Sequence, residues 1–171
     1  MKWVFRGKCW KFGDNLAIDG EIMPLRFALA REMSPEVLKH HVMEEIDPEF
    51  AKKVNPGDIV VAGKRFGQGN PHIQGLLGLK GLGLGLVVES IPRGSYRNAI
   101  NAALPFLPHC PNVTQLAESG DDLEVDFQTG LFINHTQNIR RQFEPLPKPL
   151  LNIIEEGGFF AVTKKRLQQS G

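Results

Sequence analysis

Two short apolar runs mark the middle of the chain. Ile59–Ala62 and Leu84–Glu89 are rich in Val, Ile and Leu without polar alternation, which is typical of strands buried on both faces. Between them, apolar residues recur at helical spacing from Ile73 to Leu79. A strand, a crossover helix and a second strand predict a parallel pair, so the sequence indicates an α/β fold.

A glycine-rich loop joins the first of these strands to the helix. It contains Gly63, Gly67 and Gly69 and ends in Asn70-Pro71, where asparagine suits an N-cap and proline the first helical position. Such strand-to-helix loops bind ligands in open α/β folds, and their free backbone N–H groups attract anions. The loop matches neither the phosphate-loop motif nor the dinucleotide-binding motif. A tight turn without a ligand is the alternative.

The rest of the pattern predicts shorter elements on both sides of this unit. Before it we expect a strand within Met1–Lys11, a helix from Ser34 whose apolar face reaches Ile46, and a short helix after Asp47. After it we expect a helix from Gly94 or Ser95 through Ala102, a strand at Leu104–Leu107, a helical turn at Val113–Ala117, a β-hairpin of Leu123–Phe127 and Leu131–Asn134, a helix at Leu146–Glu156 and a last strand at Phe159–Val162.

Length and charge narrow the class of protein. The 171 residues suit one domain spanning 1–171. Twenty basic and nineteen acidic residues leave a formal charge of +1, which does not indicate a nucleic-acid-binding surface. No apolar stretch reaches membrane-spanning length and no signal-peptide core follows the N-terminal lysines. These features predict a cytoplasmic protein without a membrane or nucleic-acid partner.

The cysteine content bears on cofactors. Cys9 and Cys110 are the only cysteines, whereas an iron–sulfur cluster needs three or four thiolates. The adjacent His40 and His41 cannot face one metal from one side of a helix. We therefore predict no metal or cofactor in this chain, with both cysteines serving as small core residues.

Four separated motifs carry a resemblance to a known family. They are WKFGDN at 10–15, DPEFAKKVNPGDIVVAGKRFGQG at 47–69, SYRNAINAALP at 95–105 and GDDLEVDFQTG at 120–130. With these four motifs in this order, the chain resembles the small subunit of 3-isopropylmalate dehydratase. That subunit corresponds to the swivelling C-terminal domain of aconitase. The resemblance covers nearly the whole chain. It implies one swivelling β/β/α domain with a mainly parallel core sheet.

The resemblance also implies an activity and a partner. In this family, a small hydroxy-carboxylate is dehydrated and rehydrated so that its hydroxyl moves to the adjacent carbon, a reaction of leucine biosynthesis. A separate large subunit holds a [4Fe–4S] cluster whose open iron binds the substrate. The small subunit closes over that site.

The loop departs from the family where the chemistry is expected. Relatives typically read Gly-Ser-Ser-Arg-Glu, with the first serine as base and the arginine paired to a carboxylate, whereas this chain reads Gly69-Asn70-Pro71-His72-Ile73. Asn70 takes the base position, although an amide cannot accept a proton as an alkoxide can. His72 replaces the arginine and can bind a carboxylate as imidazolium or act as the base itself. Asn70 and His72 are therefore the catalytic candidates.

Substrate-binding candidates surround these two positions. Gln68 and Gly69 belong to the same loop, and Arg65 offers a positive charge near the missing arginine. We expect Gln68, Asn70 and His72 to point into one open cleft, with Arg65 or Arg26 close by.

Two further arginines match family arginines outside the loop. Asp19, Glu21 and Arg26 are the nearest matches to an acidic segment that precedes an arginine, and Arg93 matches an arginine at the second strand end. Either arginine can fork a carboxylate. The alternatives are a solvated side chain for Arg26 and a surface ion pair for Arg93.

Two classes of function follow from these residues. One is a hydro-lyase subunit with an altered base or substrate. The other is a non-catalytic subunit or an anion-binding module that uses the glycine-rich loop.

Overall fold

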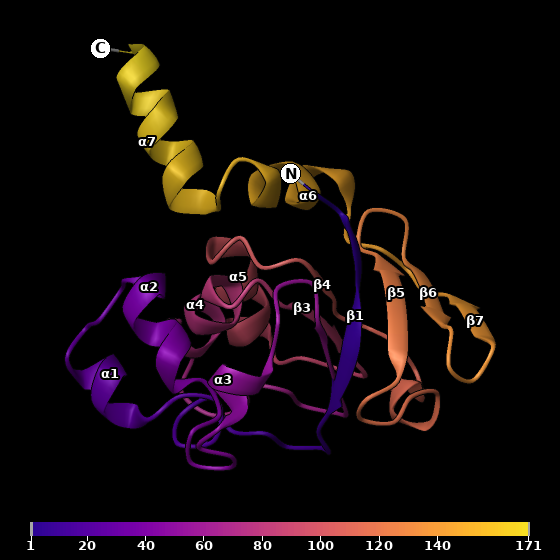
Figure 1. Ribbon diagram of the computed structural model, residues 1–171. Helices are drawn as coiled ribbons and strands as arrows, with labels where there is room; N and C mark the ends of the chain where they lie inside the picture. The colour runs from indigo at the N-terminus through magenta and orange to yellow at the C-terminus, as the bar shows by residue number, and fades with distance from the viewer. Residues whose placement is uncertain (1, 171) are drawn as a thin grey trace.

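The computed structural model describes residues 2–170 and contains a seven-stranded sheet with helices packed beside it (Figure 1). The strands are β1 (Val4–Lys11), β2 (Ile59–Ala62), β3 (Gly85–Val88), β4 (Phe106–Leu107), β5 (Asp122–Asp126), β6 (Leu131–Asn134) and β7 (Ile139–Gln142). The helices are α1 (Leu25–Leu29), α2 (Pro35–Leu38), α3 (Phe50–Lys53), α4 (Gln74–Gly81), α5 (Arg93–Asn101), α6 (Lys148–Glu155) and α7 (Phe159–Ser170), with 3-10 turns η1 (Lys39–His41) and η2 (Val113–Gln115). Met1, which the predicted first strand included, lies outside the described residues.

The sheet is parallel on one side of β1 and antiparallel on the other. Its strand order is β4-β3-β2-β1-β5-β6-β7. Strands β1 to β4 pair in parallel, and β1, β5, β6 and β7 pair antiparallel. The α/β class, the parallel pair of β2 and β3 and the predicted hairpin are confirmed. The sheet as a whole is mixed rather than mainly parallel, because tight turns join β5 to β6 and β6 to β7 without a crossover helix.

Burial follows this division of the sheet. All residues of β2 and β3 are buried, as expected for parallel strands covered on both faces. In Figure 1, α1 to α5 gather beside the parallel strands, and β5 to β7 form the opposite edge. Strands β5 and β6 alternate between buried and half-buried positions, so only one of their faces belongs to the core. Cys9 and Cys110 are both buried in that core, as predicted.

A buried carboxylate ties the first two parallel strands together. Asp58 is only 4% exposed. Its Oδ1 accepts a hydrogen bond from the backbone N–H of Lys8 at 2.9 Å, and its Oδ2 accepts from the Trp10 indole and the Asn55 backbone, each at 2.9 Å. Gly7 leaves room for this carboxylate, because a Cβ there would lie 2.5 Å from Asp58 Oδ1. The contact fixes the start of β2 against β1.

The central helix begins later than the sequence predicts. Asn70 was expected as its N-cap and Pro71 as its first residue, but α4 starts at Gln74. The Asn98 side chain donates a hydrogen bond to the Pro71 carbonyl at 2.7 Å. Gly94 lies so close that a Cβ there would be 2.5 Å from Pro71 Cβ. Packing against α5 therefore keeps Asn70 and Pro71 in the loop.

The helix expected from Ser34 to Ile46 is also shorter. It ends after α2 and η1, and Val42 is already extended with ψ 128°. This turn buries Val42 and Met43 completely, whereas Ile46 remains 43% exposed. Val42 packs directly against Gly78, because a Cβ on Gly78 would lie 2.6 Å from Val42 Cγ2. Core packing against α4 overrides the helical periodicity here.

The last predicted strand is a helix. Phe159–Val162 forms the first turn of α7, which continues to Ser170. The residues after this turn, Lys164 to Gln169, are good helix formers. Gly157 and Gly158, with φ of +98° and +100°, turn the chain between α6 and α7.

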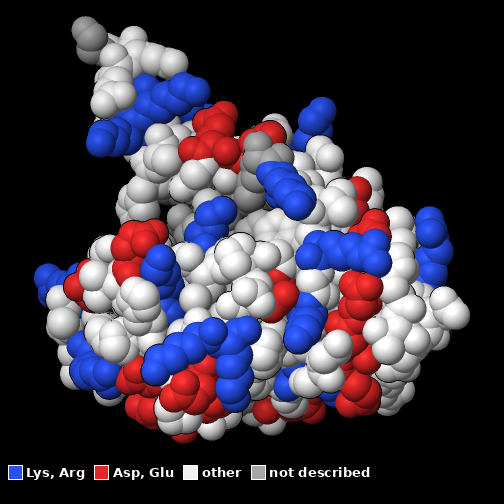
Figure 2. Space-filling view, viewed as in Figure 1, with Lys and Arg blue, Asp and Glu red and all other residues white. Residues whose placement is uncertain are grey.

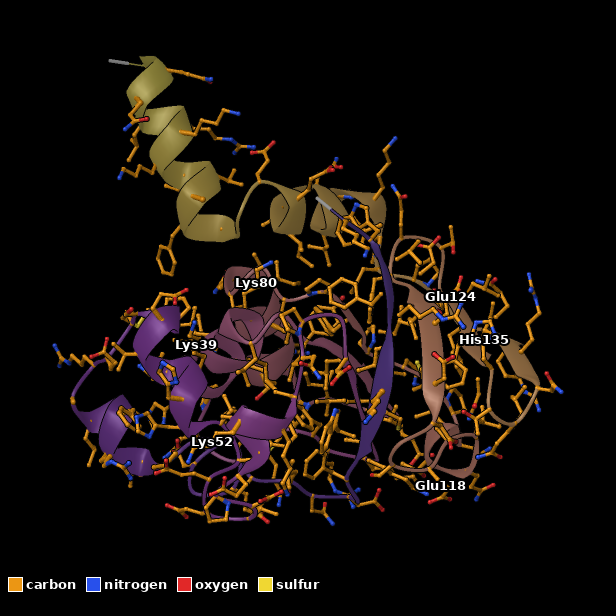
Figure 3. The ribbon with its side chains drawn as sticks, in the orientation of Figure 1. Lys39, Lys52, Lys80, Glu118, Glu124 and His135 are labelled. Carbon is orange, nitrogen blue, oxygen red and sulfur yellow. The ribbon has the colours of Figure 1, made fainter. Side chains whose placement is uncertain are left out.

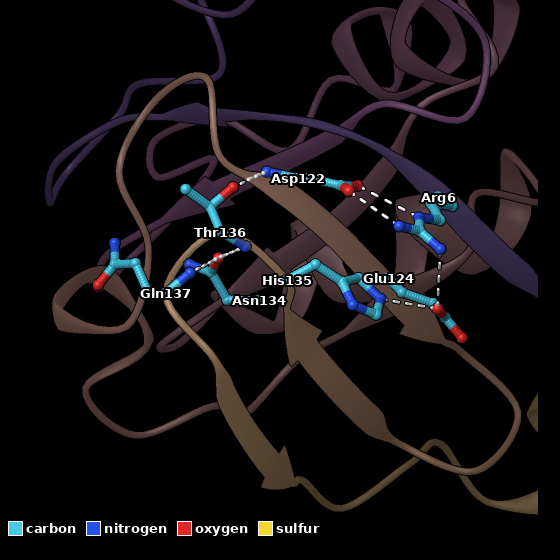
Figure 4. A network of polar contacts seen from close by, with 7 residues as sticks. All are labelled: Arg6, Asp122, Glu124, Asn134, His135, Thr136 and Gln137. Carbon is cyan, nitrogen blue, oxygen red and sulfur yellow. Dashed lines mark hydrogen bonds and ion pairs between the residues drawn. The ribbon is translucent and has the colours of Figure 1, made fainter.

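Exposed ion pairs cover the antiparallel edge. Arg6 Nη2 lies 2.9 Å from Asp122 Oδ2, and Glu124 Oε1 lies 2.9 Å from His135 Nε2 (Figure 4). The hydrogen bond from Arg6 lowers the pKa of the Asp122 carboxyl. Labelled charged side chains lie in separate parts of the fold, such as Lys52 on α3 and Glu118 in the loop before β5 (Figure 3). Positive and negative side chains are interspersed on the face shown in Figure 2. Pairs this exposed contribute little to stability.

The buried carboxylate gives a stability prediction. Asp58→Ala should lower the free energy of unfolding by about 3 kcal/mol, because three part-buried donors lose their shared buried acceptor. Urea denaturation measures this loss. Asp122→Ala is the matched control and should lose far less, since its ion pair with Arg6 is exposed. Equal losses in the two variants would contradict the anchoring role of Asp58.

Candidate functional site

The loop after β2 is held between two other segments of the chain. On one side, the N–H of Gly67 donates to the Leu16 carbonyl at 2.8 Å, and the N–H of Ile18 donates to the Gln68 carbonyl at 3.0 Å. On the other side, the N–H of Phe66 donates to the carbonyl of Ser90, just beyond β3, at 3.1 Å. These contacts place the loop at the carboxyl ends of the parallel strands, where open α/β folds bind ligands.

Helix α5 fixes the middle of the loop. Ser95, predicted as a helix cap, lies inside the first turn, and its hydroxyl donates a hydrogen bond to the Gly67 carbonyl. Gly67 has φ +77°, and a Cβ there would lie 2.7 Å from Ser95 Oγ. Only glycine meets both conditions without strain. The loop is therefore a fixed platform joined to α5.

A histidine–aspartate pair lies at the end of this platform. His72 Nδ1 is 2.7 and 2.9 Å from the two carboxylate oxygens of Asp19. Because an ionised carboxylate only accepts, Nδ1 carries the proton in this pair. Nε2 makes no hydrogen bond with any described residue, so in neutral His72 it is a free proton acceptor. The side chains of His72 and Asp19 are 37% and 24% exposed, so solvent and ligands can reach them.

His72 also lines an open groove of ≈550 Å³ between α1, α4, α5 and α7. Arg31 contributes a cation, and Asn98 and Asn101 contribute amides from α5. Met33 and Phe160 add apolar surface. The groove thus combines a base, a cation and apolar walls, a set that suits a small carboxylate with an apolar side chain.

The other predicted site residues lie around the groove without lining it. Arg65 and Gln68 both contact Asn15, Arg65 through the Asn15 side chain and Gln68 through its carbonyl. Gly69 and Asn70 are exposed in the loop just before the groove-lining Pro71. The structure therefore brings His72, but not Gln68 or Asn70, into the groove wall.

The two arginines predicted outside the loop have other surroundings. Arg26 forms an ion pair with Glu44 at 2.7 Å and lies 4.6 Å from the centre of the Phe27 ring. Arg93 is exposed at the start of α5. The cation that lines the groove is instead Arg31, which forms no ion pair with any residue of the described range 2–170.

Sequence reasoning missed three features of this site. It did not pair Asp19 with His72, which are 53 positions apart, nor did it single out Arg31 or Asn98. Only Asp19 carried a signal, as part of an acidic segment next to a turn. Arg31 and Asn98 enter the site through the packing of α1 and α5 beside α4, which no local pattern reveals.

The cysteines do not form a cluster site. Cys9 and Cys110 are buried, and burial raises the pKa of each thiol to about 12. Between residues 2 and 170, no group of three His, Cys, Asp or Glu side chains is placed to hold a metal ion. Over the same range, no helix has the length and apolar character of a membrane span.

No model of a known protein family matches the chain, but individual proteins match it over nearly its whole length. It is 45% identical over 166 residues to 3-isopropylmalate dehydratase small subunit 2 of Archaeoglobus fulgidus, an alignment that covers 96% of each chain. It is 40% identical over 171 residues to the isopropylmalate/citramalate isomerase small subunit of Methanocaldococcus jannaschii, covering 99% of each.

A solved structure supports the same relationship. The crystal structure of 3-isopropylmalate dehydratase from Methanocaldococcus jannaschii matches the fold with a TM-score of 0.85 and 31% identity, covering 98% of each chain. With such identity across the full length of several relatives and a shared fold, this chain belongs to the small-subunit family of 3-isopropylmalate dehydratase, a family of hydro-lyase subunits.

Proposed function

We propose that this chain is the small subunit of an isomerase that moves a hydroxyl between adjacent carbons of a small hydroxy-dicarboxylate by dehydration and rehydration. Its relatives are named for 3-isopropylmalate and for citramalate, and both molecules belong to the proposed substrate class. The observation that carries the proposal is the His72–Asp19 pair, which supports an acid–base role for His72 in this loop.

His72 supplies the acid–base step in this proposal. Its Nε2 takes the proton from the carbon next to a substrate carboxylate, and the C–H electron pair forms the double bond as the hydroxyl leaves the neighbouring carbon. Asp19 holds the Nδ1 proton and stabilises the imidazolium that results. During rehydration, His72 returns the proton while the hydroxyl adds to the other carbon.

The groove supplies the binding contacts. Arg31 forms an ion pair with one substrate carboxylate, and the amides of Asn98 and Asn101 donate hydrogen bonds beside it. Met33 faces an apolar substituent. Arg65, Gln68 and Gly69 remain candidates for the second carboxylate once a partner closes over the loop. The catalytic role of Asn70 and the substrate-binding roles of Arg26 and Arg93 remain predictions.

In this proposal the leaving hydroxyl needs a Lewis acid, and the two buried cysteines of this chain are too few to hold an iron–sulfur cluster. A [4Fe–4S] cluster on a separate large subunit would supply that Lewis acid when the two subunits assemble. We place this complex in the cytoplasm, in leucine biosynthesis or in a related pathway.

Reconstitution tests the function. The chain should co-purify with a large subunit from the same organism, and the complex should interconvert 3-isopropylmalate or citramalate with its positional isomer. Neither subunit alone should do so. A stable complex without activity on these and related hydroxy-diacids would favour a non-catalytic role.

Replacing the base should abolish most of the turnover. In the assembled enzyme, His72→Ala should lower kcat by ~10²–10⁴ fold, the usual contribution of a general base. His135→Ala is the matched control, because His135 is similarly exposed and also pairs with a carboxylate, but on the far edge of the sheet. Steady-state kinetics on both variants measure the difference.

A second variant separates the two roles open to His72. If His72 only pairs with a carboxylate, His72→Ala should raise KM while leaving kcat nearly unchanged, and His72→Arg should retain activity by restoring a forked donor. Unchanged kcat and KM in His72→Ala would remove His72 from the site.

Asp19 should act as a positioning residue. Asp19→Asn keeps the size of the side chain, but its amide favours the tautomer with the proton on Nε2, which cannot accept a proton there. We expect kcat to fall ~10²-fold or more with little change in KM. The double variant with His72→Ala should be no slower than His72→Ala alone. Additive losses would mean that the two residues act separately.

A further inference from the structure

Helix α7 leaves the body of the protein (Figure 1) and carries two large exposed apolar side chains on one side. Of its twelve residues, only Val162 is buried. Phe160 and Leu167 are 65% and 69% exposed, and their spacing of seven positions places them on one side of the helix. A helix of this length is marginal in water without packing, and a cluster of large exposed apolar side chains marks an interaction surface.

The charges on α7 indicate what kind of surface covers it. Lys164, Lys165 and Arg166 are exposed, and α7 contains no acidic residue. Lys164 lies on the side of Phe160 and Leu167 and forms no ion pair with any described residue, whereas Lys165 and Arg166 line a pocket beside α6 together with Glu156. In Figure 2 the projecting helix carries blue side chains without red ones. A second copy that paired α7 with α7 would bring these cations together, which is unfavourable. An acidic surface on a different chain complements them better.

The position of α7 links it to the candidate site. Phe160 lines the same groove as His72 and Arg31, and Gly158 anchors the start of the helix so closely that a Cβ there would lie 2.2 Å from the Asn101 carbonyl oxygen. A chain that packs on Phe160 therefore also covers the mouth of the groove. In the proposed function, the large subunit is the chain that must do this.

We infer that the Phe160–Leu167 face of α7 docks into an apolar groove with an acidic rim on the large subunit, and that this contact closes the partner over His72. The inference rests on the proposed function for the identity of the partner. It adds the surface that recognises that partner and the chemistry of the surface it meets. The binding mode is that of an amphipathic helix in a groove, with Phe160 and Leu167 as anchors.

Affinity measurements on the full chain and the large subunit test the inference. The double variant Phe160→Ser/Leu167→Ser should raise the Kd at least ~10-fold, because exposed anchors of this size carry much of the energy of an interface. Val37→Ser/Ile46→Ser is the matched control, since it also removes two exposed apolar side chains, both 43% exposed and outside α7. Its Kd should match that of the wild type, and thermal unfolding should show that both variants fold.

A charge variant tests the acidic rim. Lys164→Glu should weaken binding, and its Kd should depend less on salt concentration than that of the wild type. An unchanged Kd in Phe160→Ser/Leu167→Ser would overturn the inference while leaving the proposed function intact. Sedimentation that shows the double variant splitting a wild-type dimer, with large-subunit affinity unchanged, would assign the face to a second copy and also overturn it. A wild-type chain that binds no large subunit would remove the proposed function as well.

Discussion

The contact between Gly67 and Ser95 is the constraint on which the candidate site depends. A side chain at position 67 would collide with the Ser95 hydroxyl, and the positive φ of Gly67 would strain any other residue. Because this contact lets α5 approach the loop, Asn98 reaches the Pro71 carbonyl and sets the position of His72. In the same loop, the Gln68 carbonyl accepts a hydrogen bond from the backbone N–H of Ile18, the residue before Asp19. One close approach of the Ser95 side chain to the loop backbone thus brings together groups from three parts of the chain.

This scaffold is shared with the family, whereas the chemistry of the loop differs. The family's usual serine position holds Asn70, which cannot serve as a base, and the base that we propose lies two positions later at His72. Such a change is compatible with the fold because backbone hydrogen bonds to neighbouring segments hold the loop at Gly67 and Gln68. In the proposed function Asp19 supports His72, since a carboxylate can orient an imidazole and stabilise its protonated form.

The local pattern of apolar and polar residues was sufficient to predict secondary structure where a strand is buried on both faces or on one. The unbroken apolar run of Ile59–Ala62 predicted a doubly covered strand, and the alternation in 123–134 predicted the hairpin. It failed where tertiary packing competes with local preference: Asn70-Pro71 reads as a helix start, but α5 holds it in the loop, and Val42 leaves its helix to fill the core. Within the site, sequence identified His72 from its place in the loop. It did not predict the pairing with Asp19, because no local signal joins residues so distant in the chain.

The contacts that Arg26 and Arg31 already make support Arg31 as the arginine of the proposed substrate site. Arg26 is engaged by Glu44, which also accepts from His41 at 2.7 Å, and its guanidinium lies over the Phe27 ring. Turning Arg26 toward a substrate carboxylate would leave Glu44 with one partner fewer and give up the contact with the ring. Arg31 has no such contacts to lose among the described residues and already lines the groove. An incoming carboxylate would therefore gain more from Arg31, so we propose that the residues just after α1, rather than the helix itself, meet the substrate.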